Sequence, residues 1–142
     1  MTDEVMELSC NLDDMCPEDI GFALELLLDA GALDVWTSPI GMKKNRPGVM
    51  LSLLCPVEEA ERFAELLFRH TTTLGIREAT HRRFCLSRRT EEANTVYGSV
   101  TCKLSQGYGV SRRKPEYEDL ARLARENDCS IAQIREAVKN KK

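Results

Sequence analysis

The sequence predicts an α+β protein, with a ferredoxin-like βαββαβ unit over residues 1–89 and a small C-terminal α+β annex over residues 90–142. Three observations predict the first unit. Four segments are interpreted as strands, with the clearest alternation of apolar and polar residues from Met6 to Leu12. Two segments carry apolar residues at helical spacing, and the segments follow in the order strand, helix, strand, strand, helix, strand. That order is typical of an antiparallel four-stranded sheet covered on one face by two helices.

Local patterns place the elements of the first unit. Apolar residues from Met6 to Leu12 alternate with polar ones, which predicts a half-buried strand. Pro17 then stands where a first helical turn begins, and Gly31 ends that helix. An amphipathic pattern predicts a second helix after Pro56. The remaining strands are expected over residues 33–37, 49–55 and 74–86.

The annex is read from its punctuating residues. Residues 87–94 (SRRTEEAN) are polar and are interpreted as a short linker. Residues 95–104 alternate as a strand, and a glycine-rich turn follows it. Pro115 is expected to begin a helix and Ser130 to cap a second one. Because the annex is small for an independent fold, we expect it to pack on the first unit or on a neighbouring chain.

Composition and charge limit the classes of function. The chain of 142 residues has a net charge of −3, with local basic groups that suit a small anionic ligand better than nucleic acid. Six cysteines form no C-x-x-C pair, and the N-terminus has no basic region followed by an apolar run, which predicts reduced cysteines in a cytoplasmic protein. No apolar stretch approaches the roughly 18 residues that cross a bilayer, so no membrane partner is expected.

An acidic turn follows the first strand. Asp13 and Asp14 end the strand, and Glu18 lies in the first turn of the next helix. Carboxylates at such a junction can hold Mg²⁺ or Mn²⁺ through one or two oxygens, with phosphates completing the shell. The alternative is structural, with Asp13 or Asp14 capping the helix and Glu18 complementing its dipole. Spacing alone favours the cap.

A basic turn, GMKKNRPG, joins two predicted strands. Its Lys43 and Lys44 offer point charges and its Arg46 a planar fork to phosphate oxygens. A solvated turn with surface charges is the alternative. The segment HTTTLGIR offers three hydroxyls that either contact phosphate or close a helix, and both interpretations stay open.

A second basic segment precedes the helix expected at Pro115. Tyr108 offers a stacking surface, and Arg112 and Lys114 adjoin N–H groups that favour phosphate. Alternatively, the acidic residues after Pro115 merely complement the helix dipole. No serine or cysteine stands in a nucleophile elbow and neither histidine has an identifiable orienting partner, so no catalytic residue is assigned.

Taken in order, these motifs resemble a known family. The similarity is to the C-terminal region of LarC, the nickel-insertion protein for the nickel-pincer nucleotide cofactor. It rests on NLDDMCPEDIGFALELLLDAGALDVWTSPIGMKKNRPGVMLSLLC, LFRHTTTLGIR, VYGSVTCK and PEYEDLARLA, and covers nearly the whole chain. The resemblance implies a CTP-dependent cyclometallase that uses Mn²⁺ or Mg²⁺ and inserts its substrate Ni²⁺ into pyridinium-3,5-bisthiocarboxylic acid mononucleotide.

The resemblance also implies partners and site roles. The nickel-free pincer precursor is the expected ligand, a homo-oligomer is the expected assembly, and the N-terminal LarC half is expected as a separate chain unless this chain is a fragment. At matching positions, Asp13, Asp14 and Glu18 are assigned to the divalent metal. The nucleotide is assigned to Lys43, Lys44, Arg46, Tyr108, Arg112 and Lys114.

One alternative function belongs to another class. Ferredoxin-like domains often pair to hold small regulatory molecules, and fold alone does not choose between function types. The chain would then be a non-catalytic ligand-sensing domain. RNA binding across the open sheet face is disfavoured, because it needs exposed aromatic residues on central strands.

Overall fold

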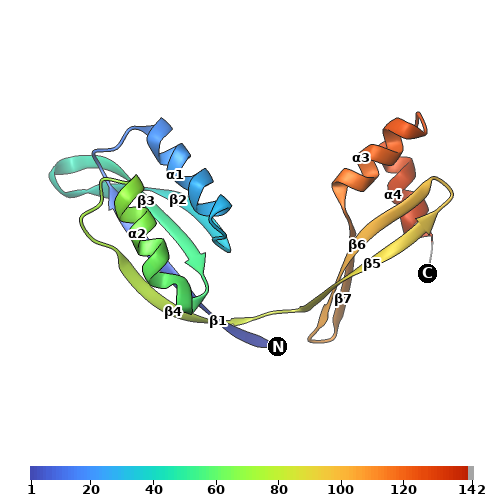
Figure 1. Cartoon of the computed structure of the whole chain (residues 1–142), viewed down its shortest axis with the longest axis horizontal. Helices are drawn as coiled ribbons and strands as arrows, with labels where there is room; N and C mark the ends of the chain where they lie inside the picture. Colours follow the sequence, from blue (N-terminus) through green and yellow to red (C-terminus); the bar gives the residue numbers. More distant parts are fainter. Residues whose placement is uncertain (141–142) are drawn as a thin grey trace. The chain divides into compact units, whose positions relative to one another are not determined.

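The computed structural model describes residues 1–140, which form two compact units. The N-terminal unit is Thr2–Arg83, and the C-terminal unit is Met1 together with the residues from Phe84 onward. Figure 1 shows that each unit consists of a β-sheet with helices on one face. The α+β class predicted from the sequence is confirmed.

The N-terminal unit has the ferredoxin-like element order. Its sheet has the strand order β2-β3-β1-β4, and β3 pairs antiparallel with both β1 and β2. Figure 1 shows α1 and α2 on the same face of this sheet. The elements are β1 (Thr2–Leu12), α1 (Pro17–Asp29), β2 (Asp34–Met42), the 3₁₀ turn η1 (Lys43–Asn45), β3 (Arg46–Cys55), the 3₁₀ turn η2 (Val57–Glu59), α2 (Ala60–His70) and β4 (Arg77–Phe84).

The core of the N-terminal unit lies between its sheet and its two helices. The β1–β3 register places Leu8 opposite Leu53 and Cys10 opposite Leu51, and directly opposed residues share one face of a sheet. Phe63 of α2 is fully buried against this surface. Because full burial of such a side chain stabilises a fold by about 1.5–3 kcal/mol, this layer fixes the register of β1.

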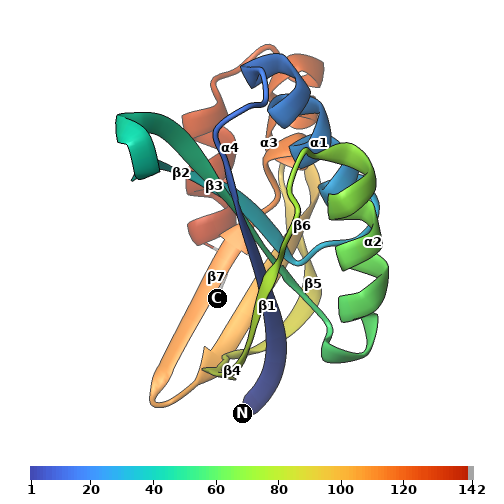
Figure 2. The ribbon, with the colours of Figure 1, turned by 90° about the vertical axis from the view of Figure 1, so that its left-hand side faces the viewer.

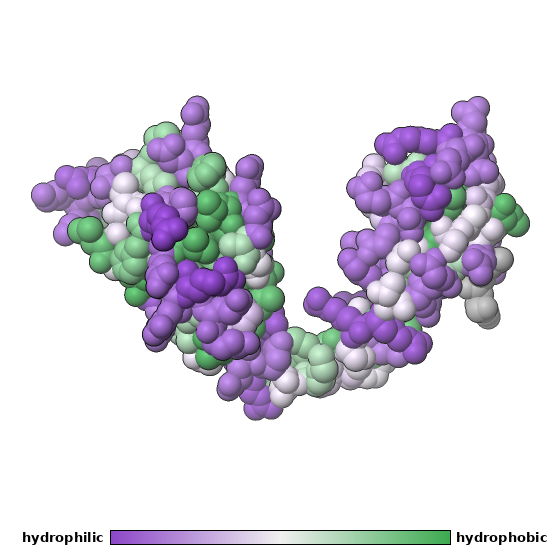
Figure 3. Space-filling model, in the orientation of Figure 1, coloured by the Kyte–Doolittle hydropathy of each residue, from purple (hydrophilic) through white to green (hydrophobic). Residues whose placement is uncertain are grey.

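The outer surface of the N-terminal unit retains exposed apolar side chains. Figure 3 shows hydrophobic residues at the surface in the region of α1 and α2. Phe22, Leu28 and Phe68 are each half exposed or more. Exposed apolar groups of this kind often mark a protein interface, which agrees with the expected homo-oligomer. The oligomer itself stays a prediction. No helix within residues 1–140 is both long and apolar enough to cross a membrane.

The C-terminal unit is a three-stranded antiparallel sheet with two helices on one face. Its strand order is β5-β6-β7, so β6 is the central strand. Figure 1 shows α3 and α4 on one side of this sheet, and Figure 2 shows the β6–β7 hairpin from another direction. The elements are β5 (Ser87–Thr95), β6 (Gly98–Gly107), β7 (Val110–Pro115), α3 (Tyr117–Glu126) and α4 (Ile131–Lys139).

Alternate residues of β6 supply the core of the C-terminal unit. Val100 and Cys102 are fully buried, and they belong to one apolar cluster with Leu123 of α3 and Ile134 of α4. Gly98, with a φ of 133°, begins β6, and a Cβ there would lie 2.9 Å from a methyl carbon of Leu123. Glycine is therefore required for both the backbone conformation and the close approach of α3.

The interpretation of residues 87–94 as a linker was wrong. Ser87–Thr95 forms β5, which is paired with β6 along its whole length. The strand escapes recognition because it lies at the edge of the sheet and is polar on its open face, and Ala93 is its one fully buried residue within the described chain. The apolar alternation on which strand prediction depends is therefore missing.

The helix predicted at Pro115 begins two residues later. Pro115 ends β7 opposite Cys102, Glu116 is the N-cap residue, and α3 starts at Tyr117. Proline is tolerated here because its missing N–H falls at the end of an edge strand. The glycine-rich turn is confirmed as the β6–β7 hairpin loop, and Ser130 caps α4 with a complete capping box.

Asp119 ties α3 to β6. One carboxylate oxygen of Asp119 accepts the Thr101 N–H at 2.7 Å, just beyond the point where β7 stops pairing with β6. The hydrogen bond from the Thr101 N–H, assisted by the Thr101 hydroxyl, lowers the pKa of Asp119 below its ordinary value. The ionised carboxylate therefore stabilises the folded C-terminal unit.

We expect Asp119→Asn to lower the free energy of unfolding at neutral pH by about 1 kcal/mol, because a neutral acceptor replaces a charged one. The folded-state pKa is the lower one, so the carboxylate's contribution is complete above the unfolded pKa of about 3.9 and is lost as the pH falls through the folded value. Denaturant titrations across this range should show the two proteins converging in acid. Glu118→Gln, in the same helical turn, is the control, and an equal loss in that variant would contradict the assignment.

Candidate functional site

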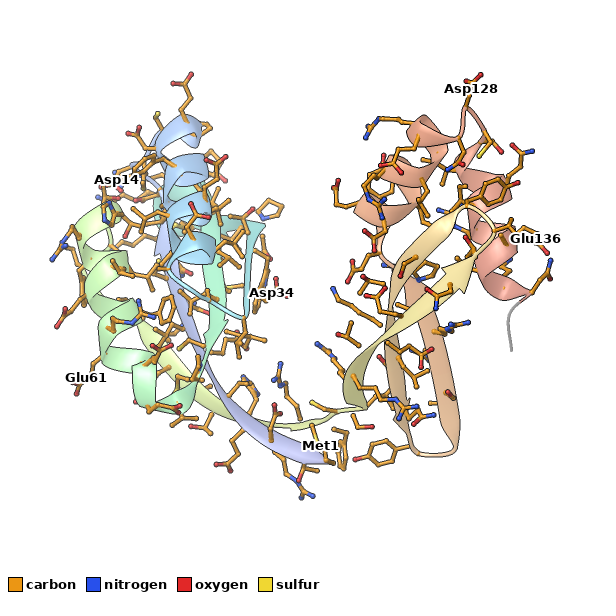
Figure 4. The ribbon with its side chains drawn as sticks, turned by 45° about the vertical axis from the view of Figure 1, so that its right-hand side comes forward. Met1, Asp14, Asp34, Glu61, Asp128 and Glu136 are labelled. Carbon is orange, nitrogen blue, oxygen red and sulfur yellow. The ribbon has the colours of Figure 1, made fainter. Side chains whose placement is uncertain are left out.

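A polar hollow lies at the end of β1 in the N-terminal unit. It has a volume of about 370 Å³ and two walls, one from the turn after β1 and one from the connection between α2 and β4. These walls meet because β1 and β4 are neighbours in the sheet. Figure 4 shows Asp14 toward one end of the unit and Glu61, in the first turn of α2, toward the other. The lining residues are Asn11, Asp13, Asp14, Thr72, Thr73, Leu74, Gly75 and Arg77.

The two aspartates of the acidic turn are each held by a distant segment. The Thr72 hydroxyl donates to Asp14 at 2.5 Å, and the Arg46 guanidinium lies 3.3 Å from Asp13. Neither aspartate caps α1, because the N-cap residue is Cys16 and no side chain makes a cap hydrogen bond there. The helix-cap interpretation was therefore wrong, and the carboxylates instead join three parts of the chain.

Glu18 stands apart from this arrangement. It lies in the first turn of α1 and is exposed. Within residues 1–140, no three or more histidine, cysteine, aspartate or glutamate side chains gather as a metal site. The structure therefore does not unite Asp13, Asp14 and Glu18 in one ligand set, and protein carboxylates alone would leave a cation here with an incomplete shell.

The hydroxyls of the threonine segment have different partners. The Thr71 hydroxyl donates to the Leu67 carbonyl at 2.6 Å and so closes α2, whereas Thr72 binds Asp14. The Thr73 hydroxyl donates to the Gly75 carbonyl at 2.8 Å and thereby shapes the turn into β4. The helix-closing interpretation is therefore confirmed for Thr71, whereas contact of this segment with phosphate stays a prediction.

Arg77 places a positive charge in the same hollow as the two aspartates. It begins β4, and its guanidinium donates to the Asn11 side-chain oxygen at 3.0 Å. Sequence analysis assigned Arg77 no site role, although it ends the HTTTLGIR segment. Its position depends on the placement of β4 beside β1, so only the strand order of the predicted fold could have indicated that Arg77 lies near the acidic turn.

A buried thiol adjoins this polar hollow. Burial raises the pKa of Cys10, while a hydrogen bond with Thr73 and the charge of Arg77 act in the opposite direction. Burial likewise raises the pKa of Cys55 and of Cys102. Since the thiolate is the form that binds soft metals, these three cysteines behave as small core residues, as their apolar-phase positions predicted.

The basic turn extends past the end of β1. The last β1–β3 pair is Leu12 with Val49, while β2 and β3 continue as a projecting hairpin (Figure 2). Lys43 and Lys44 lie exposed in the connection, where Lys44 adopts a left-handed φ of 61°. Neither lysine lines the polar hollow, so Arg46 is the member of this cluster that contacts its residues.

Close backbone packing brings Arg46 back toward the acidic turn. A Cβ at Gly48 would lie 2.9 Å from the Leu12 carbonyl oxygen and 2.6 Å from the Met42 sulfur. Glycine at this position therefore lets the base of the hairpin pack directly against the end of β1. The Arg46–Asp13 contact is an outcome of that approach.

The remaining predicted residues belong to the C-terminal unit. Tyr108 occupies the β6–β7 turn, where its hydroxyl donates to the Met1 carbonyl at 3.0 Å and its ring contacts Phe84 edge-on. Arg112 and Lys114 lie on β7 and line a second hollow of about 540 Å³. The expected helix start beside these cations was wrong, because they lie within a strand.

Comparisons with known proteins agree with the motifs. The family model described as nickel insertion protein matches residues 1–135. A putative nickel insertion protein of Cyanothece is 42% identical over 133 residues, which cover 93% of this chain and 32% of that protein. The pyridinium-3,5-bisthiocarboxylic acid mononucleotide nickel insertion protein of Acetivibrio thermocellus is 39% identical over 136 residues, which cover 96% of this chain and 33% of that protein.

A solved structure has the same fold over almost its full length. It is LarC2, described as the C-terminal domain of a cyclometallase involved in the synthesis of the NPN cofactor of lactate racemase, in its apo form. The TM-score is 0.84 at 34% identity, covering 96% of this chain and 95% of that one. This chain spans about a third of the length of the curated relatives. The resemblance to the C-terminal region of LarC is confirmed, and the chain belongs to the nickel insertion protein family.

Proposed function

We propose that this chain is the nucleotide- and divalent-cation-binding part of a cyclometallase that inserts Ni²⁺ into pyridinium-3,5-bisthiocarboxylic acid mononucleotide at the expense of CTP. The insertion activity is supported by the family and by the named relatives. One structural observation carries the binding role. Two carboxylates, a hydroxyl segment and an arginine face one hollow, a combination that suits a hard cation bound to phosphate.

The residues of the hollow fit Mn²⁺ or Mg²⁺ accompanied by a nucleotide. Asp13, Asp14 and Asn11 offer the oxygen donors that hard cations prefer. Two adjacent carboxylates are enough when phosphate oxygens and water fill the other positions, as is usual for Mg²⁺. Such a cation would neutralise charge on the phosphates of CTP.

Arg46 and Arg77 are the proposed phosphate contacts closest to the acidic turn. Each now binds an oxygen of the hollow's own residues, Asp13 and Asn11 respectively, and phosphate oxygens are acceptors of the same kind. Lys43 and Lys44 would extend the positive surface along the exposed connection. Glu18 remains a proposed ligand of the cation. Because it does not line the hollow, it would bind the cation through a bridging water.

Tyr108, Arg112 and Lys114 are proposed nucleotide contacts of the C-terminal unit. The Tyr108 side chain is 62% exposed and offers a surface on which a base can stack. Arg112 and Lys114 supply positive charge on the neighbouring strand. The two units thus carry separate sets of phosphate-binding side chains.

Calorimetric titration of CTP in the presence of Mn²⁺ tests the phosphate assignment. We expect Arg46→Ala and Lys44→Ala each to weaken binding about tenfold or more, since a hydrogen bond to a charged group contributes about 1.5–3 kcal/mol. Arg62→Ala is the matched control, because its guanidinium binds Glu59 and the Ala30 carbonyl and it lies on α2, outside the basic turn. Parent-like affinity in both test variants would refute the assignment.

The metal assignment makes a different prediction for the aspartates. Asp13→Asn and Asp14→Asn should weaken the binding of Mn²⁺ with CTP, yet leave metal-free CTP bound equally well or better, because a negative wall beside the phosphates is removed. Titrations with Mn²⁺ and with a chelator measure the two states. Asp29→Asn, at the exposed end of α1, is the control. Equal weakening with and without metal would show that the aspartates act only on local structure.

Turnover distinguishes insertion from ligand sensing. The chain is incubated with an N-terminal LarC half, the nickel-free precursor, Ni²⁺, Mn²⁺ and CTP, and CMP and nickel-containing cofactor are quantified. We expect both products to appear together, because CTP cleavage is proposed to accompany insertion. CTP bound without CMP formation under these conditions would favour the non-catalytic ligand-sensing domain.

A further inference from the structure

The open face of the C-terminal sheet carries an unusual concentration of positive charge. Its hollow of about 540 Å³ has seven lining residues, all of them cationic or hydroxyl-bearing: Arg88, Arg89, Thr90, Lys103, Ser105, Arg112 and Lys114. The hydroxyls offer hydrogen bonds of either sense, whereas the arginines and lysines only donate. The composition therefore matches an anion with several acceptor oxygens.

The strand register explains why six of these side chains share the open face, whereas Arg89 lies opposite Leu104 and borders the hollow from the edge of the sheet. Arg88 on β5 and Arg112 on β7 lie opposite the same β6 residue, Ser105. In the next row of the same face, Thr90 and Lys114 flank Lys103. Because β6 alternates, Val100, Cys102 and Leu104 point to the helices and leave Lys103 and Ser105 on the other side.

This arrangement is electrostatically unfavourable on its own. Lys103 stands directly opposite Lys114, and like charges in directly opposed cross-strand positions repel. Glu116 offsets part of this charge through an ion pair with Lys103 at 2.7 Å. Within residues 1–140, Arg88, Arg112 and Lys114 have no carboxylate partner at ion-pair distance. A bound anion would relieve the repulsion.

The positive surface is short. In the row after Lys103, Glu92 faces Thr101 and accepts hydrogen bonds from the hydroxyls of Thr101 and Ser99. The positive side chains therefore occupy two rows, about 7 Å apart along the strands, and the next row carries the acidic Glu92. That extent fits one phosphate group or a short phosphate chain, whereas nucleic acid needs many phosphate contacts.

The two hollows differ in the sign of their charges. The hollow of the N-terminal unit contains Asp13 and Asp14, which attract a cation, whereas the described lining of the C-terminal one contains no carboxylate. A metal–triphosphate complex brings its cation with it and suits the first hollow. A metal-free phosphate monoester carries a negative charge close to two and suits the second.

From this contrast we propose that the open face of the C-terminal sheet is a second, metal-independent phosphate site that binds the phosphate monoester of a pyridinium mononucleotide, with Arg88 and Lys103 as contacts beside Arg112 and Lys114. The proposal rests on the proposed function, and it takes the nucleotide contacts Arg112 and Lys114 of the C-terminal unit to be contacts of the precursor mononucleotide, while CTP with its metal occupies the N-terminal hollow. Tyr108, on the β6–β7 turn, offers an exposed aromatic ring four residues before Arg112.

The test measures the binding of nicotinic acid mononucleotide to the full chain in the presence of a chelator. We expect binding that falls about tenfold or more in Arg88→Gln and in Lys103→Gln, while CTP with Mn²⁺ binds as in the parent. Arg125→Gln, an exposed arginine in the last turn of α3, is the matched control. Thermal unfolding of every variant confirms that the C-terminal unit remains folded, and inorganic phosphate should raise its midpoint in the parent more than in Arg88→Gln.

Three results would overturn the proposal. Weakened binding of CTP with Mn²⁺ in Arg88→Gln, with mononucleotide binding unchanged, would place the triphosphate on this face. An equal effect of Arg125→Gln would mean that overall charge alone attracts the ligand. Tighter binding of a long oligonucleotide than of the mononucleotide would indicate a nucleic-acid surface. The proposed function fails separately, through parent-like binding of CTP with Mn²⁺ in Arg46→Ala and Lys44→Ala.

Discussion

The position of β1 in its sheet governs the polar hollow of the N-terminal unit. With β3 on one side and β4 on the other, the end of β1 meets both the base of the β2–β3 hairpin and the segment that leads into β4. Asp13 therefore reaches Arg46, and Asp14 reaches Thr72. A shift of one residue in the β1 register would turn every β1 side chain to the other face of the sheet and would displace the acidic turn that follows the strand. Packing of the core and assembly of the site therefore depend on the same register.

The same constraint explains which members of the predicted set come together. Arg46 pairs with β2 at the first position after the turn, where Gly48 allows the hairpin to approach Leu12 closely. Lys43 and Lys44 fall in the connection itself and so remain in solvent. Adjacent residues of one basic motif therefore have different environments. The arginine is placed by the backbone, and the lysines keep the rotamer freedom of long exposed side chains.

Sequence patterns predicted the fold of the N-terminal unit because its strands and helices have strong periodicity, as Met6 to Leu12 illustrates. They failed for Ser87–Thr95, where a polar edge strand has little apolar alternation. Site prediction failed in a comparable way. Asp13 and Asp14 were visible as neighbours in the chain. Thr72 contacts Asp14, and Arg77 lines the same hollow, only because β4 lies beside β1 in the folded sheet. Motif reading finds local groups and leaves their long-range partners undetermined.

The hollows of the two units differ in the charges of their lining side chains. Carboxylates and arginines coexist in the N-terminal hollow, so a cation and its phosphates can each find a partner of opposite sign there. On the C-terminal sheet, Glu92 and Glu116 lie outside the hollow. Its described lining consists of cationic and hydroxyl-bearing side chains. A cation would be repelled from that face and a bare phosphate attracted to it. Under the division of ligands that we propose, this separation keeps each hollow selective, because a single shared site would favour whichever ligand carried the better-matched charge.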